Sequence, residues 1–225
     1  MSFLVVANFK SHKNSSEVKS WISVVAPVAQ DSPSTIIVAP SFTHLAIDHR
    51  PSSIALAAQD VSPFPPGSYT GAINATQLQE LDVRYCLVGH SERRHYFHET
   101  ALDVAAKVKE LIEVGITPII CLRKEDLVPD RATLDDGLIA SCYFCYEPPS
   151  DIGGSVTAPL EDIGNITSQI KQIFNTGKVM YGGSVNADNL TSLLSLGLSG
   201  VIISTACLNP VSFNQIIAQL SHVKN

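Results

Sequence analysis

Short apolar runs alternate with longer amphipathic stretches along the chain. Each run is four to seven residues long and is bounded by polar residues, glycine or proline. Continuous apolar character over this length is typical of strands buried on both faces, as in a parallel sheet. We therefore expect eight parallel strands, at residues 3–7, 35–39, 54–58, 85–88, 116–121, 140–146, 178–181 and 200–204.

The stretch at 99–114 gives the clearest helix signal, and Gly115 is expected to end that helix. Two further helices are expected, at 186–196 with Asn186 as cap and at 210–222 with Pro210 in the first turn. The predicted buried stripe of the first helix is Leu102, Ala105, Ala106, Val108, Leu111 and Ile112, against a polar face of Lys107, Lys109, Glu110 and Glu113.

Eight strands alternating with helices predict an α/β protein with a (β/α)8 barrel, since each right-handed crossover brings the next parallel strand alongside. A doubly wound open sheet shows the same alternation. However, Asn8-Phe9-Lys10 follows the first strand, where a dinucleotide-binding sheet has G-x-G-x-x-G. No linker or low-complexity tract divides the chain, so we expect a single domain over 1–225.

The chain is shorter than the roughly 250 residues usual for such a barrel. The fifth connection, 122–139, has only 18 residues, whereas 91–115 has 25. We therefore expect a shortened fifth helical connection, away from the residues on which function depends.

Composition excludes several classes of partner. The net charge is −6, from 21 acidic and 15 basic residues, and the pI is about 5.6. Such a chain offers no electrostatic footprint for nucleic acid or anionic lipid. The five cysteines lie mostly in apolar runs and indicate buried thiols in a reducing compartment. With no signal-peptide core and no membrane-spanning stretch in the sequence, we expect a cytoplasmic protein without a membrane partner.

Candidate chemistry lies where strands end, because the carboxyl ends of barrel strands face a common site. Taken singly, each candidate has a structural alternative: Lys10 as a solvated loop residue, His90 as a satisfied buried histidine and Glu147 as an ion-paired edge residue. Glu147 is the sharpest, since it follows a buried strand and precedes two prolines, where desolvation makes a carboxylate a useful base. The candidates are Asn8, Lys10, His90, Glu147, Gly182-Gly183-Ser184 and Ser204-Thr205.

Two other constellations are set aside. His90, His95 and His98 lack the H-x-x-x-H spacing that places two imidazoles on one helix face, so we expect no metal. Cys142 and Cys145 form C-x-x-C within a predicted strand, where residues three apart face opposite sides, rather than at the helix N-terminus of a redox pair.

The motifs together resemble the triosephosphate isomerase family over nearly the whole chain. The resemblance implies a TIM barrel that interconverts dihydroxyacetone phosphate and D-glyceraldehyde 3-phosphate without a cofactor. The matching segments are Asn8-Phe9-Lys10, Ala58-Gln59-Asp60, Tyr69-Thr70-Gly71, Val88-Gly89-His90-Ser91-Glu92-Arg93-Arg94, Tyr146-Glu147-Pro148, Ile152-Gly153 and Tyr181-Gly182-Gly183-Ser184-Val185.

The resemblance also implies residue roles. Glu147 is the base, and His90 is a neutral electrophile and proton shuttle. Lys10 supplies positive charge, Asn8 a hydrogen bond, and Glu92 a partner for Lys10. Backbone N–H groups of Gly153, Ser184, Ser204 and Thr205 hold the substrate phosphate. Residues 148–158, with stiff prolines and flexible glycines, are expected to form a lid, or else an ordinary surface connection.

The chain departs from the family pattern at three places. Ser204-Thr205 replaces two glycines, which restricts positive φ, while Phe9 replaces a tryptophan and Ser150-Asp151 an apolar pair. Ser204-Thr205 and Asp151 leave open a phosphate-binding paralogue with weak or lost activity. Another enzyme on a phosphate-binding barrel is a third alternative, which the complete catalytic set does not favour. The segment containing Thr70 enters the partner's site in long family members, so a homodimer or homotetramer is implied.

Overall fold

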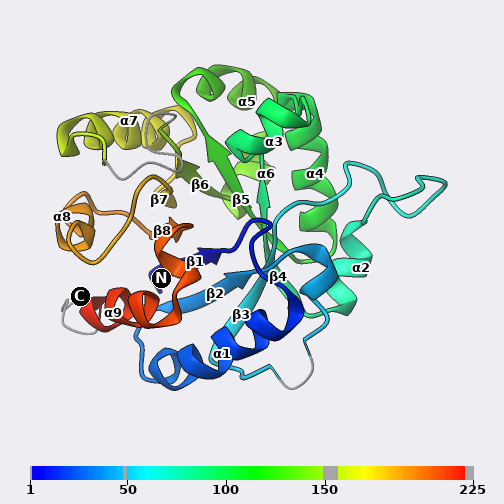
Figure 1. The fold of residues 1–225 in the computed structure, drawn as a ribbon. Coiled ribbons are helices and arrows are strands. Elements are labelled where there is room, and N and C mark those ends of the chain that lie inside the picture. The colour runs from blue at the N-terminus through cyan, green and yellow to red at the C-terminus, as the bar shows by residue number, and fades with distance from the viewer. Residues whose placement is uncertain (1, 48–49, 149–156, 221–225) are drawn as a thin grey trace.

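The chain forms a closed barrel of eight parallel strands, in the order β1 to β8, with β8 paired back to β1. The computed structural model describes residues 2–47, 50–148 and 157–220. Figure 1 shows the strands at the centre, with the long helices around them. The (β/α)8 prediction is confirmed. The strands are β1 Leu4–Asn8, β2 Thr35–Ala39, β3 Ile54–Ala58, β4 Val83–Val88, β5 Thr117–Leu122, β6 Tyr143–Tyr146, β7 Val179–Tyr181 and β8 Gly200–Ile203.

The sixth strand is shorter than its apolar run predicts. β6 begins at Tyr143, because Ala140 and Ser141 end the helix that precedes it. The apolar run continues from the end of the helix into the strand, so its hydrophobic pattern does not show where one element ends and the next begins.

Helices fill the connections, and several begin with side-chain caps. Asn14, Asn74 and Thr100 each form a capping box, which satisfies free N–H groups of the first turn. The helices are α1 Ser15–Gln30, α2 Ala75–Glu80, α3 Ser91–Tyr96, α4 Ala101–Glu113, α5 Leu127–Thr133, α6 Asp136–Ser141, α7 Leu160–Ile173, α8 Leu190–Leu194 and α9 Pro210–Leu220, with 3₁₀ turns η1 Phe42–His44, η2 Lys124–Asp126 and η3 Ala206–Leu208.

Helix α4 ends before Gly115 as predicted, with φ +78° at that glycine. The predicted exposure is wrong for two residues of this helix. Leu102 is 72% exposed, and Lys107 is only 4% exposed. The lysine is buried because its ammonium contacts two buried carboxylates, Asp60 at 2.7 Å and Glu99 at 3.0 Å.

The other two predicted helices also exist. α9 begins at Pro210 as expected. α8 is shorter than 186–196, since Asn186 accepts hydrogen bonds from the N–H groups of Asp188 and Asn189 in a turn before the helix.

Two apolar layers form the core. Inward-facing strand residues such as Val6, Ile119 and Met180 fill the barrel interior. A larger layer between sheet and helices includes Trp21, which stacks edge-on against Phe9. The packed interior leaves the loops at the strand ends as the place for a site.

Two connections depart from a regular barrel. The fifth carries only short helices, α5 and α6, which agrees with the predicted shortening. The third, between β3 and α2, projects from the barrel as an exposed arm, residues 63–72 (Figure 1). On this arm, the rings of Phe64 and Tyr69 stack at 4.5 Å.

Among the helices of residues 2–47, 50–148 and 157–220, none is long and apolar enough to cross a membrane.

Candidate active site

The loop after β1 holds Lys10 in an unusual backbone conformation. Lys10 has φ +48°, a left-handed value that L-residues with a side chain adopt at a cost. Its N–H donates to Asn8 Oδ1 at 3.0 Å, and its carbonyl accepts from Gln59 Nε2 at 2.8 Å. The same Gln59 nitrogen donates to the carbonyl of Ala39, at 2.8 Å. Gln59 therefore fixes the loop that presents the Lys10 ammonium.

Three polar side chains meet above the barrel, from the loop after β1 and from the loop and helix after β4. The ammonium of Lys10 lies 2.7 Å from Glu92 Oε1, and the other oxygen of Glu92 lies 3.6 Å from His90 Nδ1. Glu92 thus contacts both the cation and the imidazole.

The imidazole of His90 is oriented by the helix that it caps. His90 is the N-cap of α3, and its Nδ1 accepts the N–H of Glu92 at 3.2 Å. A ring nitrogen that accepts carries no proton, so the single proton of a neutral His90 lies on Nε2. Nε2 is then a hydrogen-bond donor on the side away from the helix.

Glu147 lies directly after β6 and is almost fully buried, at 1% exposed. One carboxylate oxygen lies 3.3 Å from His90 Nε2, and the other accepts the N–H of Ser91 at 3.2 Å. A Cβ added at Gly182 would lie 3.2 Å from Glu147 Cγ, so glycine leaves space for this carboxylate.

A cavity of about 480 Å³ opens beside these residues. Its walls include Asn8, Lys10, His90 and Glu92, whereas buried Glu147 is not among them. His90 thus lines the cavity and also contacts the Glu147 carboxylate, at 3.3 Å. The charged and imidazole side chains on the cavity wall are Lys10, Arg93, His12, His90, Asp60 and Glu92. A cavity of this size with charged side chains on its wall suits a small polar ligand.

Three of the four predicted phosphate-binding residues, Ser184, Ser204 and Thr205, follow β7 and β8. The carbonyl of Ser184 accepts from Asn189 Nδ2 at 2.6 Å and from Thr157 Oγ1 at 2.9 Å, which fixes the turn after β7. Thr205 has φ −60° and precedes η3, so the structure requires no positive φ there and the side chain imposes no backbone strain.

Some predicted residues cannot be placed. Gly153, together with Ser150, Asp151 and most of the predicted lid, lies outside the described residues.

A ring of four charged side chains supports the loop that carries His90. The guanidinium of Arg93 lies 2.7 Å from Asp60 and 3.0 Å from Glu99. Lys107 contacts the same two acids from α4. Burial raises the pKa of the Asp60 carboxyl, an effect that the charge of Lys107 opposes. The sequence indicated neither this ring nor Gln59, although the motifs contained Asp60, Arg93 and Gln59.

All five cysteines are buried and free, as predicted. Burial raises the pKa of Cys142 to about 12, which makes it a poor nucleophile. Cys142 precedes β6 rather than lying within it, so that part of the prediction is wrong. Cys145 instead faces Cys121, in register on β5.

Within the part of the chain that the structure describes, no three His, Cys, Asp or Glu side chains are grouped so that they could hold a metal ion.

Comparison with known proteins gives a consistent result. The family model described as "Triosephosphate isomerase" matches residues 3–220. The protein of that name from Francisella tularensis subsp. mediasiatica is 32% identical, over 99% of both chains. The protein of that name from Chlamydia felis is 31% identical, over 96% of this chain and 97% of its own. The one from Thermus thermophilus is 33% identical, over 93% of this chain and 95% of its own. With the barrel and the strand-end cluster, this similarity shows that the chain belongs to the triosephosphate isomerase family.

Proposed function

We propose that the chain is an active triosephosphate isomerase, a single-domain enzyme that interconverts dihydroxyacetone phosphate and D-glyceraldehyde 3-phosphate without a cofactor. The observation that carries the proposal is the contact of Glu147 with His90 Nε2, at 3.3 Å, beside the Lys10–Glu92 ion pair. A base, a neutral donor and a cation are the three groups that proton transfer next to a carbonyl requires.

Glu147 is the base of the proposed reaction. In the proposed reaction the carboxylate leaves its contacts with His90 and Ser91 and moves to the cavity. It then takes a proton from the hydroxymethyl carbon of dihydroxyacetone phosphate, and the electron pair moves onto the carbonyl oxygen to give an enediolate. The protonated Glu147 then returns the proton to the neighbouring carbon, so no proton or electron is gained or lost overall.

Lys10, His90 and Asn8 stabilise the enediolate. The proton on His90 Nε2 serves the two substrate oxygens in turn, since the N–H of Glu92 occupies Nδ1. The ammonium of Lys10 offsets the negative charge that develops on the enediolate. Glu92 positions that ammonium, at 2.7 Å.

Backbone N–H groups of Gly153, Ser184, Ser204 and Thr205 bind the phosphate in this proposal. Several oriented N–H dipoles share the charge of a dianion without a metal. The backbone of Thr205 is in the right-handed helical region, with φ −60° and ψ −48°. This supports the proposal that a threonine in place of glycine at this position does not prevent phosphate binding.

We further propose that the enzyme is a cytoplasmic homodimer or homotetramer. The arm at 63–72 carries the exposed, stacked rings of Phe64 and Tyr69. Tyr96 and Phe97, on the cavity wall, are 69% and 66% exposed. Contact between the arm of one subunit and the cavity rim of another would bury both sets of aromatic rings.

A coupled assay that follows conversion of the triose phosphate tests the function. Purified protein is expected to turn over substrate in both directions. In Glu147→Ala, kcat is expected to fall about 1,000-fold because the base is gone. The matched control is Glu161→Ala, an exposed acid at the start of α7, in which kcat stays within about twofold.

Two outcomes would contradict the proposal. Full activity in Glu147→Ala would show that another group is the base. Phosphate-ligand binding without measurable isomerisation in the unaltered protein would favour a binding paralogue.

A further inference from the structure

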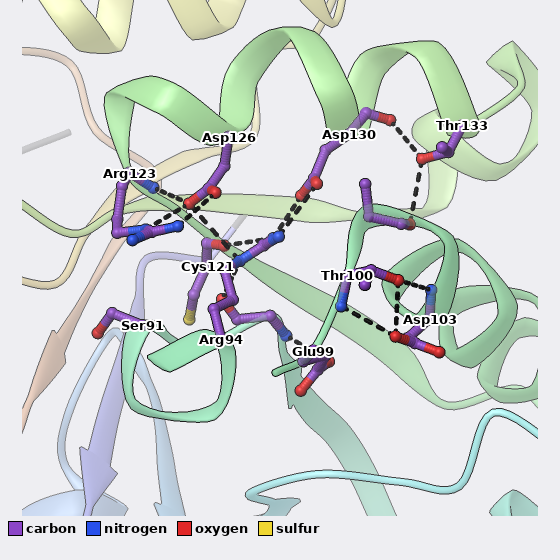
Figure 2. A network of polar contacts seen from close by, with 12 residues as sticks. Ser91, Arg94, Glu99, Thr100, Asp103, Cys121, Arg123, Asp126, Asp130 and Thr133 are labelled. Carbon is purple, nitrogen blue, oxygen red and sulfur yellow. Dashed lines mark hydrogen bonds and ion pairs between the residues drawn. The ribbon is translucent and has the colours of Figure 1, made fainter. Parts of the chain in front are cut away.

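A second polar cluster lies behind the loop that carries His90, centred on the guanidinium of Arg94. From α3, Arg94 Nε donates to the carbonyl of Gly89 at 2.8 Å, and Nη2 donates to the carbonyl of Cys121, on β5, at 3.3 Å. Asp130, on α5, accepts from both terminal nitrogens, at 2.5 and 3.2 Å. Figure 2 shows the guanidinium between α5, the end of β5 and the loop before α3.

Gly89 and Arg94 fit together at the backbone. Gly89 has φ +69°, and a Cβ there would lie 2.5 Å from Arg94 Nη2. The guanidinium thus occupies the place that a side chain at position 89 would fill. Because Gly89 directly precedes His90, the Arg94 hydrogen bond to its carbonyl restrains the backbone that aims the imidazole.

Asp130 in turn restrains the guanidinium. Its side chain is fully buried, and that of Arg94 is 6% exposed. Asp126, at the end of η2, lies 3.5 Å from Arg94 Nε and pairs with Arg123 at 2.8 Å. A planar guanidinium held by a two-point carboxylate contact has one orientation, which a single-point contact would not impose.

Stability alone does not account for this pair. Removing an arginine and a carboxylate from water costs about as much as their attraction returns, so a buried ion pair contributes little to folding compared with apolar residues of similar size. What the pair supplies is geometry, because three carbonyl or carboxylate partners from separate elements converge on one rigid group.

We propose that Asp130 and Arg94 are positioning residues for the isomerisation, with Asp130 orienting Arg94 and Arg94 fixing the Gly89–His90 backbone that aims the imidazole. The proposal rests on the proposed function. It also makes the shortened fifth connection part of the support of the site, whereas the sequence predicted that this connection lies away from the functional residues.

The ionisation of Asp130 sets the pH range over which this geometry holds. Burial raises the pKa of its carboxyl to about 6, although the charge of Arg94 opposes the rise and those of Asp126 and Glu99 add to it. Those three groups face Asp130 from α3, η2 and the loop before α4. Below about pH 6 the carboxyl therefore takes up a proton and can no longer accept from both guanidinium nitrogens as a carboxylate.

The test compares Asp130→Asn, Arg94→Lys and the double variant. We measure kcat, KM and the inhibition constant of inorganic phosphate. The matched control is Asp136→Asn on α6, an 88% exposed acid that pairs with Arg131 at 2.7 Å. Because a small misplacement of a catalytic group lowers the rate and not the phosphate contacts, kcat is expected to fall about tenfold in each single variant. KM and the inhibition constant are expected to stay within about twofold.

The double variant is expected to be no slower than the slower single variant, since both changes break one unit. An unchanged kcat in Asp130→Asn, additive losses, or a parallel rise of the inhibition constant with the loss of kcat would each overturn the proposal.

A second readout needs no turnover and so separates this proposal from the proposed function. Nitrogen-15 NMR of the His90 imidazole is expected to show shifted Nδ1 and Nε2 resonances in Asp130→Asn but not in Asp136→Asn. In the unaltered protein, the amide resonances of Gly89 and Glu92 are expected to follow the Asp130 carboxyl resonance through one pH midpoint. Unchanged imidazole resonances in Asp130→Asn would overturn the proposal. So would amide resonances of Gly89 and Glu92 that show no change at the pH midpoint of Asp130.

Discussion

Burial of Asp130 determines how this residue responds to pH. The native carboxyl has a pKa of about 6, against 3.8 for its ordinary value. Between these values the native state holds the proton more tightly than the unfolded chain does. Stability linked to this group is therefore full below about pH 4 and is lost as pH rises through about 6.

This linkage gives a prediction at the residue scale. The free energy of unfolding of the unaltered protein, minus that of Asp130→Asn, is expected to increase by about 1 to 3 kcal/mol between pH 7 and pH 4.5. Urea denaturation at both pH values measures it. The same difference for Asp136→Asn is expected to change by less than about 0.5 kcal/mol. A pH-independent difference for Asp130→Asn would show that burial does not raise its pKa.

Single residues also mark the limit of what the sequence predicts. Lys10, His90 and Glu147 are identifiable because each follows a predicted strand within a characteristic motif. Gln59 and Asp130 are not, since their partners lie 49 and 36 positions away and only the closed barrel brings them together. The residues that orient the candidate site are therefore harder to predict from the sequence than those proposed to react.

At the scale of elements, helix α4 shows how charge alters a periodic pattern. Lys107 occupies a buried position because Asp60 and Glu99 surround its ammonium. Leu102 lies in the first turn and is 72% exposed. Hydrophobic periodicity correctly predicts that Val108 and Leu111 are buried, but it cannot predict a charged residue that is buried in an ion network.

The two positions are expected to differ strongly in stability. Lys107→Met leaves two buried carboxylates short of a cation and is expected to lower the free energy of unfolding by about 3 kcal/mol. Leu102→Ala removes exposed apolar surface and is expected to change it by less than about 0.5 kcal/mol. Chemical denaturation of both variants decides the matter. Equal effects would mean that the ring around Lys107 does not support α4.

At the scale of the whole molecule, the alternation of elements fits a barrel or a doubly wound open sheet, and Asn8-Phe9-Lys10 after the first strand favours the barrel. The eight short apolar runs predict eight buried strands, and the structure shows that these strands close into a barrel. The arm at 63–72 carries no regular element, so only the structure shows that it projects from the barrel (Figure 1).

The proposed subunit contact predicts how the assembly responds to changes in the arm. Analytical ultracentrifugation of the unaltered protein is expected to give a multiple of the 24.2 kDa chain mass. Replacing Phe64 and Tyr69 by serine removes the stacked rings and is expected to lower the mass to that of one chain, or of a smaller assembly. Val211→Ser, at an exposed apolar position on α9, is the control and is expected to leave the mass unchanged. A monomeric, active unaltered protein would contradict the proposed contact.

At Lys10 the requirement for an unstrained backbone conflicts with the requirement for a positively charged side chain. A glycine at this position adopts φ +48° without the penalty that a lysine pays, so the fold on its own favours glycine by about 1 kcal/mol. Lysine is favoured at this position by the charge of its ammonium, which pairs with Glu92. The residue of this loop with a left-handed backbone thus also carries the ammonium of the candidate site. Substitutions chosen for thermostability alone would favour glycine at position 10 and remove that ammonium.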